Sequence, residues 1–252
     1  MVEALSLTKK YAEKKVVDDV SVKVQKQNIT AFIGPNGAGK STLLSMISRI
    51  IMKDSGQVLI DDKEIEQCNS NDLAKKISIL KQSNHINIRL SIRDLVSFGR
   101  FPYSQGNLTK EDWKYVDEAI RYLELEDIQD KYLDQLSGGQ RQRAYIAMVL
   151  AQDTEYILLD EPLNNLDMKH SVQIMKVLRR MVDELGKTIV IVIHDINFAS
   201  CYADRIVALK DGKIVKEGRT DEIINNAVLK EIYDMDMSIQ NVNNCKICVY
   251  FT

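Results

Sequence analysis

The most informative segment of this 252-residue sequence is a glycine-rich run that ends in a lysine and two hydroxyl residues. It reads Gly34, Pro35, Asn36, Gly37, Ala38, Gly39, Lys40, Ser41 and Thr42, a full match to the phosphate-loop pattern GxxxxGK[ST]. Glycines let the backbone curl so that several N–H groups face one point, and a helix beginning near Lys40 adds its positive end. We expect Lys40 to reach the β- and γ-phosphates of a nucleoside triphosphate, Ser41 to ligate magnesium, and Thr42 to contact the α-phosphate side.

Ionisable residues follow two short apolar runs farther along the chain. Asp160 and Glu161 follow the run 156–159, and His194 follows the run 188–193. Ligands of open α/β sheets bind at the carboxyl ends of the strands, so these side chains are candidates for one site. We expect Asp160 to hold magnesium directly or through water, Glu161 to act as general base on the attacking water, and His194 to contact the γ-phosphate.

A second device for binding an anion lies at residues 136–140. A serine and two glycines stand directly before a predicted helix there, so a hydroxyl and a helix N-terminus meet. The polar and glycine positions are Ser137, Gly138, Gly139 and Gln140. An ordinary helix cap explains this segment equally well by itself. Beside a complete phosphate loop, it indicates a second phosphate-type site in the same chain.

A strand must precede the phosphate loop and a helix must follow it, and the sequence predicts both. The apolar run 29–33 ends at the loop, and 42–51 has apolar residues at helical spacing. This context favours a phosphate site over an ordinary glycine-rich turn. Farther on, the runs 156–159 and 188–193 flank a predicted helix at 169–185, which is a strand–helix–strand unit of a buried parallel sheet.

The remaining segments predict a mixed architecture around this core. Residues 2–27 alternate β-branched and charged residues, which predicts one or two antiparallel strands, and 57–61 predicts another strand. Residues 84–151 change character and predict a mostly helical insertion, whereas 206–217 predicts a hairpin with an Asp-Gly turn. The insertion contains predicted helices at 109–125 and 139–151 and an irregular stretch at 99–107.

Composition excludes several classes of protein. Hydrophobic residues make up 45% of the chain, enough for a buried core, and 34 Lys+Arg against 36 Asp+Glu argue against a dedicated nucleic-acid binder. No apolar run approaches the roughly 20 residues of a membrane span, and the N-terminus lacks a signal-peptide pattern. We therefore expect a soluble intracellular protein that reaches a membrane only through a partner.

The four cysteines give a weaker signal. Cys68, Cys201, Cys245 and Cys248 have no framework-like spacing, which favours a reducing compartment. Cys245 and Cys248 form a CxxC, but no second pair completes a tetrahedral zinc site. An incidental terminal pair is the favoured interpretation, with redox or metal chemistry as the alternative.

Three of these segments resemble the motifs of ATP-binding-cassette (ABC) ATPases. Residues 34–42, 136–140 and 157–161 are similar to the Walker A, signature and Walker B motifs of that family. The LSGGQ signature is specific when it lies between the two Walker motifs, and the resemblance covers nearly the whole chain. It implies ATP and Mg²⁺ as ligands and an α/β fold: a P-loop NTPase core, an N-terminal antiparallel β subdomain and a helical ABC subdomain.

The resemblance also implies how the chain is divided and assembled. It implies a single ABC ATPase domain over 1–252, with a core of about 1–83 and 152–252 and a helical subdomain of about 84–151. It further implies a head-to-tail homodimer that encloses two ATP molecules. Each ATP would be held by the Walker motifs of one subunit and by residues 137–140 of the other.

Further single residues match the family pattern. Tyr11 resembles the aromatic residue that stacks on adenine, and Gln82 resembles the Q-loop glutamine, a contact of magnesium and water. Asp167 ends a segment, 164–167, that resembles the D-loop, and His194 resembles the switch histidine. A strand-edge aromatic and a surface polar residue are the structural alternatives for Tyr11 and Gln82.

Several positions depart from the family pattern. Lys81 stands where a proline often precedes the glutamine, and Leu163 and the pair 164–165 replace commoner small or hydroxyl residues. None of these changes removes a catalytic group, so they indicate a subgroup.

Two classes of ABC protein fit the motifs: an ATPase that energises a membrane permease, and a soluble protein of translation or DNA repair. Soluble members generally carry two cassettes, or long coiled-coil or zinc insertions, and this chain has neither. The absence of any span favours an importer with separate permease subunits. We therefore expect a peripheral protein on the cytoplasmic face of a bacterial membrane, coupled indirectly to a substrate-binding lipoprotein and without a nucleic-acid partner.

The substrate class rests on resemblance alone. Residues 90–103 and 161–167 resemble iron-chelate importers, which take up ferric siderophores, haem or vitamin B12. Petrobactin- or catecholate-type ferric siderophores are the favoured expectation. Residues 90–103 would also line the groove for a permease helix, unless their apolar side chains are core. Within them, Gly99, Arg100 and Pro102 are the predicted exposed docking surface.

Overall fold

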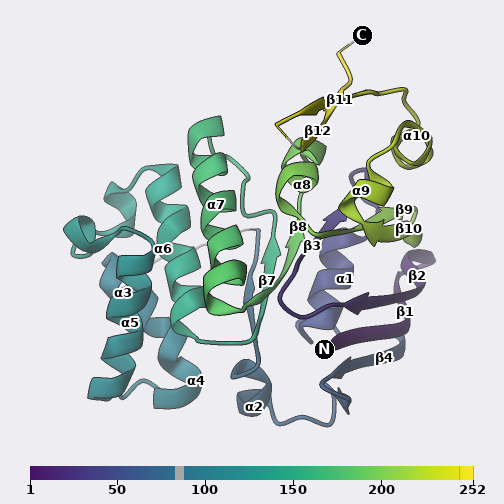
Figure 1. Ribbon diagram of the computed structural model, residues 1–252. Coiled ribbons are helices and arrows are strands. Elements are labelled where there is room, and N and C mark those ends of the chain that lie inside the picture. Colours follow the sequence, from purple (N-terminus) through teal and green to yellow (C-terminus); the bar gives the residue numbers. More distant parts are fainter. Residues whose placement is uncertain (83–87, 244, 252) are drawn as a thin grey trace.

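A six-stranded sheet runs through the centre of the molecule, whose computed structural model describes residues 1–82, 88–243 and 245–251 (Figure 1). Its strand order is β10–β9–β3–β8–β7–β6, and every neighbouring pair except β10–β9 is parallel. The strands are β3 (Ile29–Ile33), β6 (Ile77–Leu80), β7 (Tyr156–Asp160), β8 (Thr188–Val192), β9 (Arg205–Lys210) and β10 (Lys213–Arg219). Parallel strands end at the same edge, so the loops after β3, β6, β7 and β8 meet there. The predicted α/β class is confirmed.

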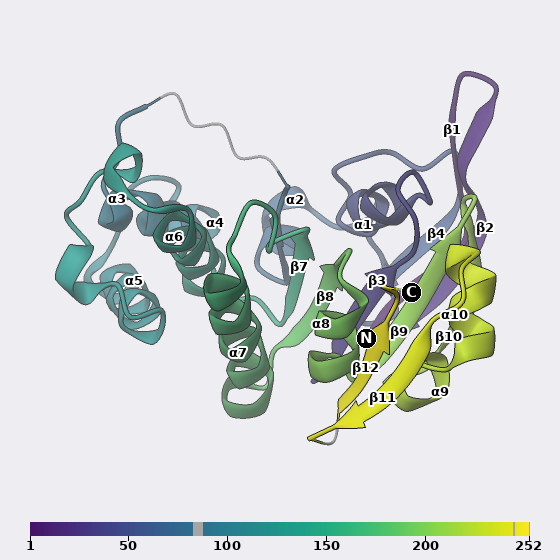
Figure 2. The same cartoon turned by 90° about the horizontal axis from the view of Figure 1, so that it is seen from above.

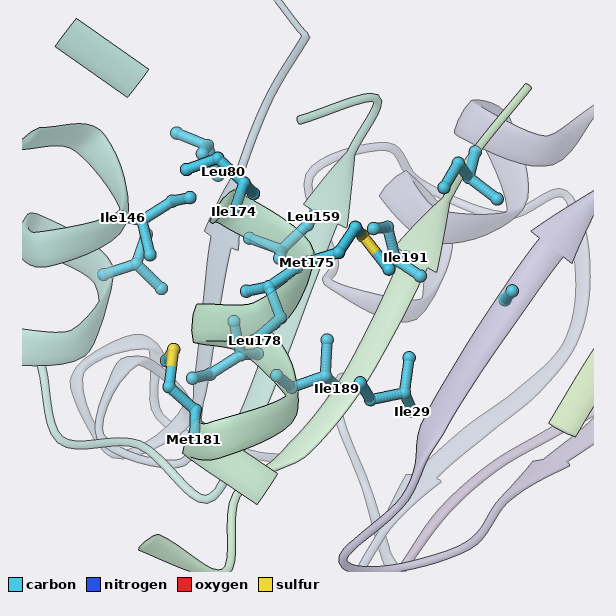
Figure 3. Packing of buried hydrophobic residues seen from close by; sticks show 14 of the residues in the cluster. Ile29, Leu80, Ile146, Leu159, Ile174, Met175, Leu178, Met181, Ile189 and Ile191 are labelled. Atoms are coloured by element: carbon cyan, nitrogen blue, oxygen red, sulfur yellow. The ribbon is translucent and has the colours of Figure 1, made fainter. Parts of the chain in front are cut away.

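Side chains of β3 alternate between two hydrophobic clusters, one on each face of the sheet. Ala31 belongs to the cluster that contains α7 (Met168–Leu185), and Phe32 belongs to the cluster around α1 (Lys40–Ile47). Figure 3 shows the first cluster, with these labelled side chains of α7, β7 and β8: Ile174, Met175, Leu178, Met181, Leu159, Ile189 and Ile191. Burying one such side chain contributes about 1.5–3 kcal/mol, so this contact fixes α7 against the sheet.

A second, antiparallel sheet contains the N-terminal strands. Its order is β2–β1–β4–β5, and Val2 pairs with both Val24 and Ile60. The strands are β1 (Val2–Tyr11), β2 (Lys14–Val24), β4 (Ser55–Ile60) and β5 (Lys63–Glu64). Its buried face joins α1 in one cluster, so this sheet covers the helix that follows the phosphate loop. The predicted N-terminal antiparallel strands are confirmed, and the strand predicted at 57–61 is part of the same sheet.

A group of helices lies beyond α7, away from α1 (Figures 1 and 2). They are α3 (Ile92–Ser97), α4 (Phe101–Ser104), α5 (Lys110–Tyr122) and α6 (Gly138–Ala151), with short 3₁₀ turns at Phe98–Arg100, Glu126–Ile128 and Leu133–Gln135. Residues 84–87, where the helical insertion is predicted to begin, lie outside the described residues, and the division at 83/84 and 151/152 stays a prediction. In the described part of the chain, no helix combines the length and hydrophobicity needed to cross a membrane.

The C-terminal part, which sequence patterns left unassigned, packs back onto the core. It contains α8 (Ile196–Tyr202), α9 (Thr220–Ile223), α10 (Asn226–Tyr233) and the hairpin β11 (Ser238–Val242)–β12 (Cys245–Val249). The remaining helix, α2 (Ser70–Ala74), lies in the first half of the chain, directly before β6. The Asn197 side chain accepts from the Cys248 N–H at 2.7 Å and donates to its carbonyl at 3.2 Å, which ties β12 to α8. Cys245 and Cys248 lie three residues apart on a strand and therefore point to opposite faces, so the CxxC does not form a paired metal site.

Several predicted bounds differ from the structure by a few residues, such as the helix predicted at 109–125, which ends at Tyr122, and two differences lie at turns. The helix predicted at 42–51 ends at Ile47, where the Ser48 hydroxyl donates to the Leu44 carbonyl and Arg49 adopts a left-handed φ of 58°. The stretch 99–107, predicted as irregular, contains a 3₁₀ turn and α4. Both errors are local, because turn geometry depends on hydrogen bonds that periodicity does not report.

The prediction that Gly99 and Arg100 form an exposed docking surface is wrong. Arg100 is only 4% exposed: its guanidinium donates to Asp112 Oδ1 and to the Ala151 carbonyl, each at 3.0 Å. It also lies 3.9 Å and 4.1 Å from the ring centroids of two tyrosines, Tyr103 and Tyr115. A Cβ atom on Gly99 would lie 2.1 Å from the Met148 carbonyl oxygen, so this glycine lies against α6. The exposed residues beside them are Phe98 and Phe101, whereas Pro102 is half-buried.

The strand β6 was not predicted, because a serine interrupts its apolar run. Ser78 is 1% exposed, and its hydroxyl lies 2.8 Å from the Thr154 hydroxyl, which in turn donates to the Tyr156 carbonyl. A buried hydroxyl is tolerated where it has a hydrogen-bond partner. The partner is 76 positions away in the chain, so local pattern gave no sign of it.

Replacing Asp112 by Asn tests how strongly the buried Arg100 pair holds the helical region. Both side chains are at most 7% exposed, and breaking a buried pair on one side costs about 3–5 kcal/mol. We expect the D112N variant to lose about that much free energy of unfolding in urea titration at neutral pH. The matched control is E126Q, which breaks the exposed Arg121–Glu126 pair and should cost less than about 1 kcal/mol. Equal losses in the two variants would contradict the assignment.

Candidate active site

The phosphate loop connects β3 to α1, and its backbone demands glycine at two positions. Gly34 has φ of 136°, and a Cβ atom there would lie 1.9 Å from the Leu209 carbonyl oxygen. Gly39 has φ of 97°, and its Cβ would lie 2.4 Å from the Val16 carbonyl oxygen. Both positions therefore exclude side chains on steric grounds as well as by conformation. The neighbouring strands β9 and β2 thus shape the loop that precedes α1.

Lys40 is held inside this loop. Its ammonium group donates to the carbonyls of Gly34 at 2.7 Å and Pro35 at 2.9 Å, and the residue is only 5% exposed. Burial lowers the pKa of the Lys40 ammonium below its usual value. A phosphate anion near this group would stabilise its charged form, because an opposite charge offsets the loss of water.

Ser41 and Asp160 meet from the phosphate loop and the end of β7. The Ser41 hydroxyl donates to Asp160 Oδ1 at 2.7 Å, across 119 positions of sequence. Asp160 is 8% exposed, and burial raises the pKa of its carboxyl group, an effect that the Ser41 hydrogen bond opposes. A hydroxyl oxygen and one carboxylate oxygen side by side fit Mg²⁺, which binds oxygen ligands and usually takes only one or two carboxylates beside substrate phosphates.

Glu161, directly after β7, is the point where three donors converge. Gln82 Nε2 donates to its Oε2 at 2.6 Å, His194 Nε2 lies 2.6 Å from its Oε1, and Asn164 Nδ2 donates to Oε2. Gln82 follows β6 and His194 follows β8, so adjacent parallel strands bring these groups together. Glu161 itself has φ of 50°, an uncommon left-handed conformation for a non-glycine residue. The site holds this carboxylate in one orientation.

Asn164 was missed as a partner of Glu161 by sequence reasoning, which treated it as a departure from a loop pattern. Its backbone N–H also donates to the Glu161 carbonyl at 3.2 Å, so a tight turn returns its side chain to the carboxylate. Its position three residues after Glu161 is the only sequence signal for this contact. A cavity of about 280 Å³ opens beside these groups and His194.

The signature segment, residues 137–140, is placed elsewhere. It caps α6: the Ser137 hydroxyl accepts from the Gln140 N–H at 3.2 Å, and Gln140 Oε1 accepts from the Ser137 N–H at 3.0 Å. Ser137 and Gly138 are exposed. Figures 1 and 2 show α6 and α1 on opposite sides of the parallel sheet. One chain therefore does not place its signature segment over its own phosphate loop.

Two further predicted residues lie outside the Glu161 cluster. Tyr11 ends β1, is 49% exposed, and has the Lys9 ammonium 5.7 Å from its ring centroid. Asp167 is the N-cap of α7 and accepts from the His170 N–H at 2.9 Å. The structure thus brings together Lys40 with its loop carbonyls, Ser41 with Asp160, and Gln82 and His194 with Glu161. The roles of all these residues stay predictions.

Comparison with known proteins gives consistent results. The family model described as ABC transporter matches residues 17–164. The petrobactin import ATP-binding protein YclP of Bacillus subtilis (strain 168) is 68% identical over 252 residues, covering 100% of both chains. The petrobactin import ATP-binding protein FatE of Bacillus anthracis is 48% identical, covering 99% of this chain and 100% of its own. A solved dimeric structure, a post-hydrolysis state of the ATP-binding cassette MJ0796 bound to ADP and Pi, is 33% identical with a TM-score of 0.76, covering 87% and 99% of the two chains.

Replacing Lys40 by Ala tests the phosphate loop. The variant loses a charge-assisted contact, worth about 1.5–3 kcal/mol, so its Kd for ATP should rise by about 10- to 10²-fold in isothermal titration. Lys63→Ala, an exposed lysine on β5, serves as the matched control and should bind ATP like the unaltered protein. Normal ATP binding by the K40A variant would rule out this loop as the phosphate site.

Proposed function

Because the chain belongs to the ABC transporter family, we propose that it is the ATP-hydrolysing subunit of a bacterial importer that takes up a ferric siderophore of the petrobactin type through separate permease subunits. The observation that carries the substrate class is the 68% identity over the full length of a petrobactin import ATP-binding protein. The siderophore itself passes through the permease, so none of the residues described above contacts it.

The geometry supports a specific division of labour in hydrolysis. Lys40 would bind the β- and γ-phosphates, and Ser41 and Asp160 would hold Mg²⁺, which would supply positive charge next to the phosphates. Glu161 orients the attacking water and takes its proton. Gln82 and His194 contact the same carboxylate from neighbouring strands. Both side chains would therefore lie next to the attacking water and the γ-phosphate.

A second copy of the chain completes each site in this proposal. Ser137 and Gly138 of the signature segment are exposed and lie at a helix N-terminus, which suits the segment to bind a phosphate that another subunit presents. In a head-to-tail homodimer, residues 137–140 would cover the γ-phosphate held by the partner, and Asp167 would lie at the same interface. Tyr11 would stack on the adenine ring of the ATP bound by its own subunit. ATP then joins the two copies, and hydrolysis releases them.

We place the permease contact on the 98–103 segment of the helical region. Phe98 and Phe101 are 49% and 62% exposed, and Tyr103 is 39% exposed, so aromatic surface is available there. The buried Arg100 fixes the segment from beneath. Through this contact the chain would be a peripheral protein on the cytoplasmic face of the membrane, and the substrate-binding lipoprotein would act on it only through the permease.

Replacing Glu161 by Gln tests the catalytic assignment. The amide keeps the size of the side chain but cannot accept a proton, so the E161Q variant should bind ATP, accumulate as an ATP-bound dimer and lose turnover by about 10²–10⁴-fold. Phosphate release and light scattering with MgATP measure the two effects. Glu155→Gln, which alters an exposed carboxylate just before β7, is the control. Unchanged turnover in E161Q would refute the role of this residue.

The substrate class is tested by uptake in cells. Deleting the gene should abolish uptake of ⁵⁵Fe-labelled ferric petrobactin while uptake of a ferric hydroxamate continues. The unaltered gene should restore uptake and the E161Q form should not, since import requires hydrolysis. Undiminished petrobactin uptake in the deletion strain, with a selective loss of another chelate, would replace the proposed substrate.

A further inference from the structure

The imidazole ring of His170 occupies the space next to Gly139 of the signature segment. A Cβ atom on Gly139 would lie 2.2 Å from His170 Cδ2 and 2.5 Å from its Cγ. Gly139 is buried in the first turn of α6 and has no left-handed φ. Its backbone conformation therefore admits any residue, and within one chain the ring of His170 is what excludes a side chain.

The ring of His170 cannot easily turn away. Its Nδ1 lies 2.8 Å from Asp167 Oδ2, and its backbone N–H donates to Asp167 Oδ1 at 2.9 Å. Asp167 is the N-cap of α7, so one carboxylate fixes both the helix start and the ring. Rotating His170 to make room beside Gly139 would break the ring contact, and the side chain is only 28% exposed.

The neighbouring glycine differs in a useful way. A Cβ atom on Gly138 would lie 3.6 Å from the Asn165 carbonyl oxygen and 3.8 Å from Leu166 Cδ2, which are ordinary van der Waals distances. Residues 164–167 therefore lie along the signature segment of the same chain, but only Gly139 meets a side chain at overlapping distance. The same loop begins at Asn164, which donates to the Glu161 carboxylate.

We propose that His170 is a positioning residue that sets the signature segment against the 164–167 loop, and that Gly139 is glycine because this ring occupies its side-chain space. The inference rests on the proposed function, in which the signature segment serves the ATP of the partner subunit. Hydrogen bonds join Glu161 to Asn164 and Asp167 to His170, the backbone of residues 164–167 joins these two pairs, and the His170 ring lies against Gly139. In the proposed dimer, these contacts link Glu161, which acts on the ATP bound by its own subunit, to the signature segment, which contacts the ATP bound by the partner subunit.

The test is a pair of double-mutant cycles on the full-length chain. The variants are G139A, H170A and G139A/H170A, with G138A and G138A/H170A as the matched control cycle. Contacting residues couple strongly, so removing the ring should restore at least about tenfold of the kcat lost in G139A. The H170A change should restore nothing in G138A, where no ring contact exists. H170A alone should lower kcat several-fold. Its effect on KM for ATP should be smaller, because the phosphate loop of the variant is unaltered.

A second measurement covers variants that are hard to assay by turnover. ATP-dependent dimerisation, measured by light scattering in the E161Q background, should fall in G139A and recover in G139A/H170A. Should G139A alone fail to fold, the clash predicts a folded, ATP-binding protein for the double variant, which thermal unfolding and ATP titration would detect.

The possible results distinguish failure of the His170 role from failure of the proposed ATPase function. A double variant no more active and no better dimerised than G139A would show that the nucleotide, and not His170, requires the glycine. An H170A variant with unaltered kcat and dimerisation would also overturn the positioning role. In both cases the unaltered chain would still hydrolyse ATP. A chain that fails to hydrolyse ATP at all would instead contradict the proposed function.

Discussion

The burial of two opposite charges at one edge of the parallel sheet is the constraint on which the rest of the site depends. Lys40 and Asp160 are almost fully covered, and their hydrogen-bond partners in the described part of the chain are neutral: the loop carbonyls for Lys40 and the Ser41 hydroxyl for Asp160. Burial disfavours the charged form of each group. A nucleotide phosphate with a divalent cation would place an opposite charge next to each group at once. The phosphate loop, α1 and the end of β7 hold the two groups where one such ligand could reach both.

The parallel topology supplies that arrangement and also places the carboxylate that we propose as the base. Glu161, Gln82 and His194 follow three adjacent strands, so their mutual distances depend on strand pairing in the core. The same topology leaves the signature segment on the far side of α7, where it caps α6 and exposes Ser137 and Gly138. In the proposed function the phosphate loop and the signature segment are two half-sites that face different directions, so that association of two copies would use both.

The helix α6 connects the two surfaces through which the chain would meet its partners. Its N-terminus carries the signature segment, and the carbonyl of Ala151 at its C-terminus accepts from the buried Arg100. A 14-residue helix spans about 21 Å, so a displacement at the aromatic 98–103 segment would reach the signature segment without loss in a flexible linker. In the proposed role, His170 would tie that end of α6 to the loop after Glu161, in addition to the hydrophobic contacts that α6 makes with the core.

Features that depend on residues close together in the chain can be predicted from the sequence. The phosphate loop, the Asp160–Glu161 pair and the capped start of α6 are local patterns, because glycine conformation, strand ends and helix caps are local physics. Contacts between residues far apart in the chain could be identified only from the tertiary structure. Ser78 has its hydroxyl partner 76 positions away, Gln82 meets Glu161 across 79, and the charge of Arg100 suggested exposure although aromatic rings and Asp112 bury it. The fit between His170 and Gly139 belongs to the same class. Such contacts are set by how elements pack, and no pattern within one segment carries the position of its neighbour.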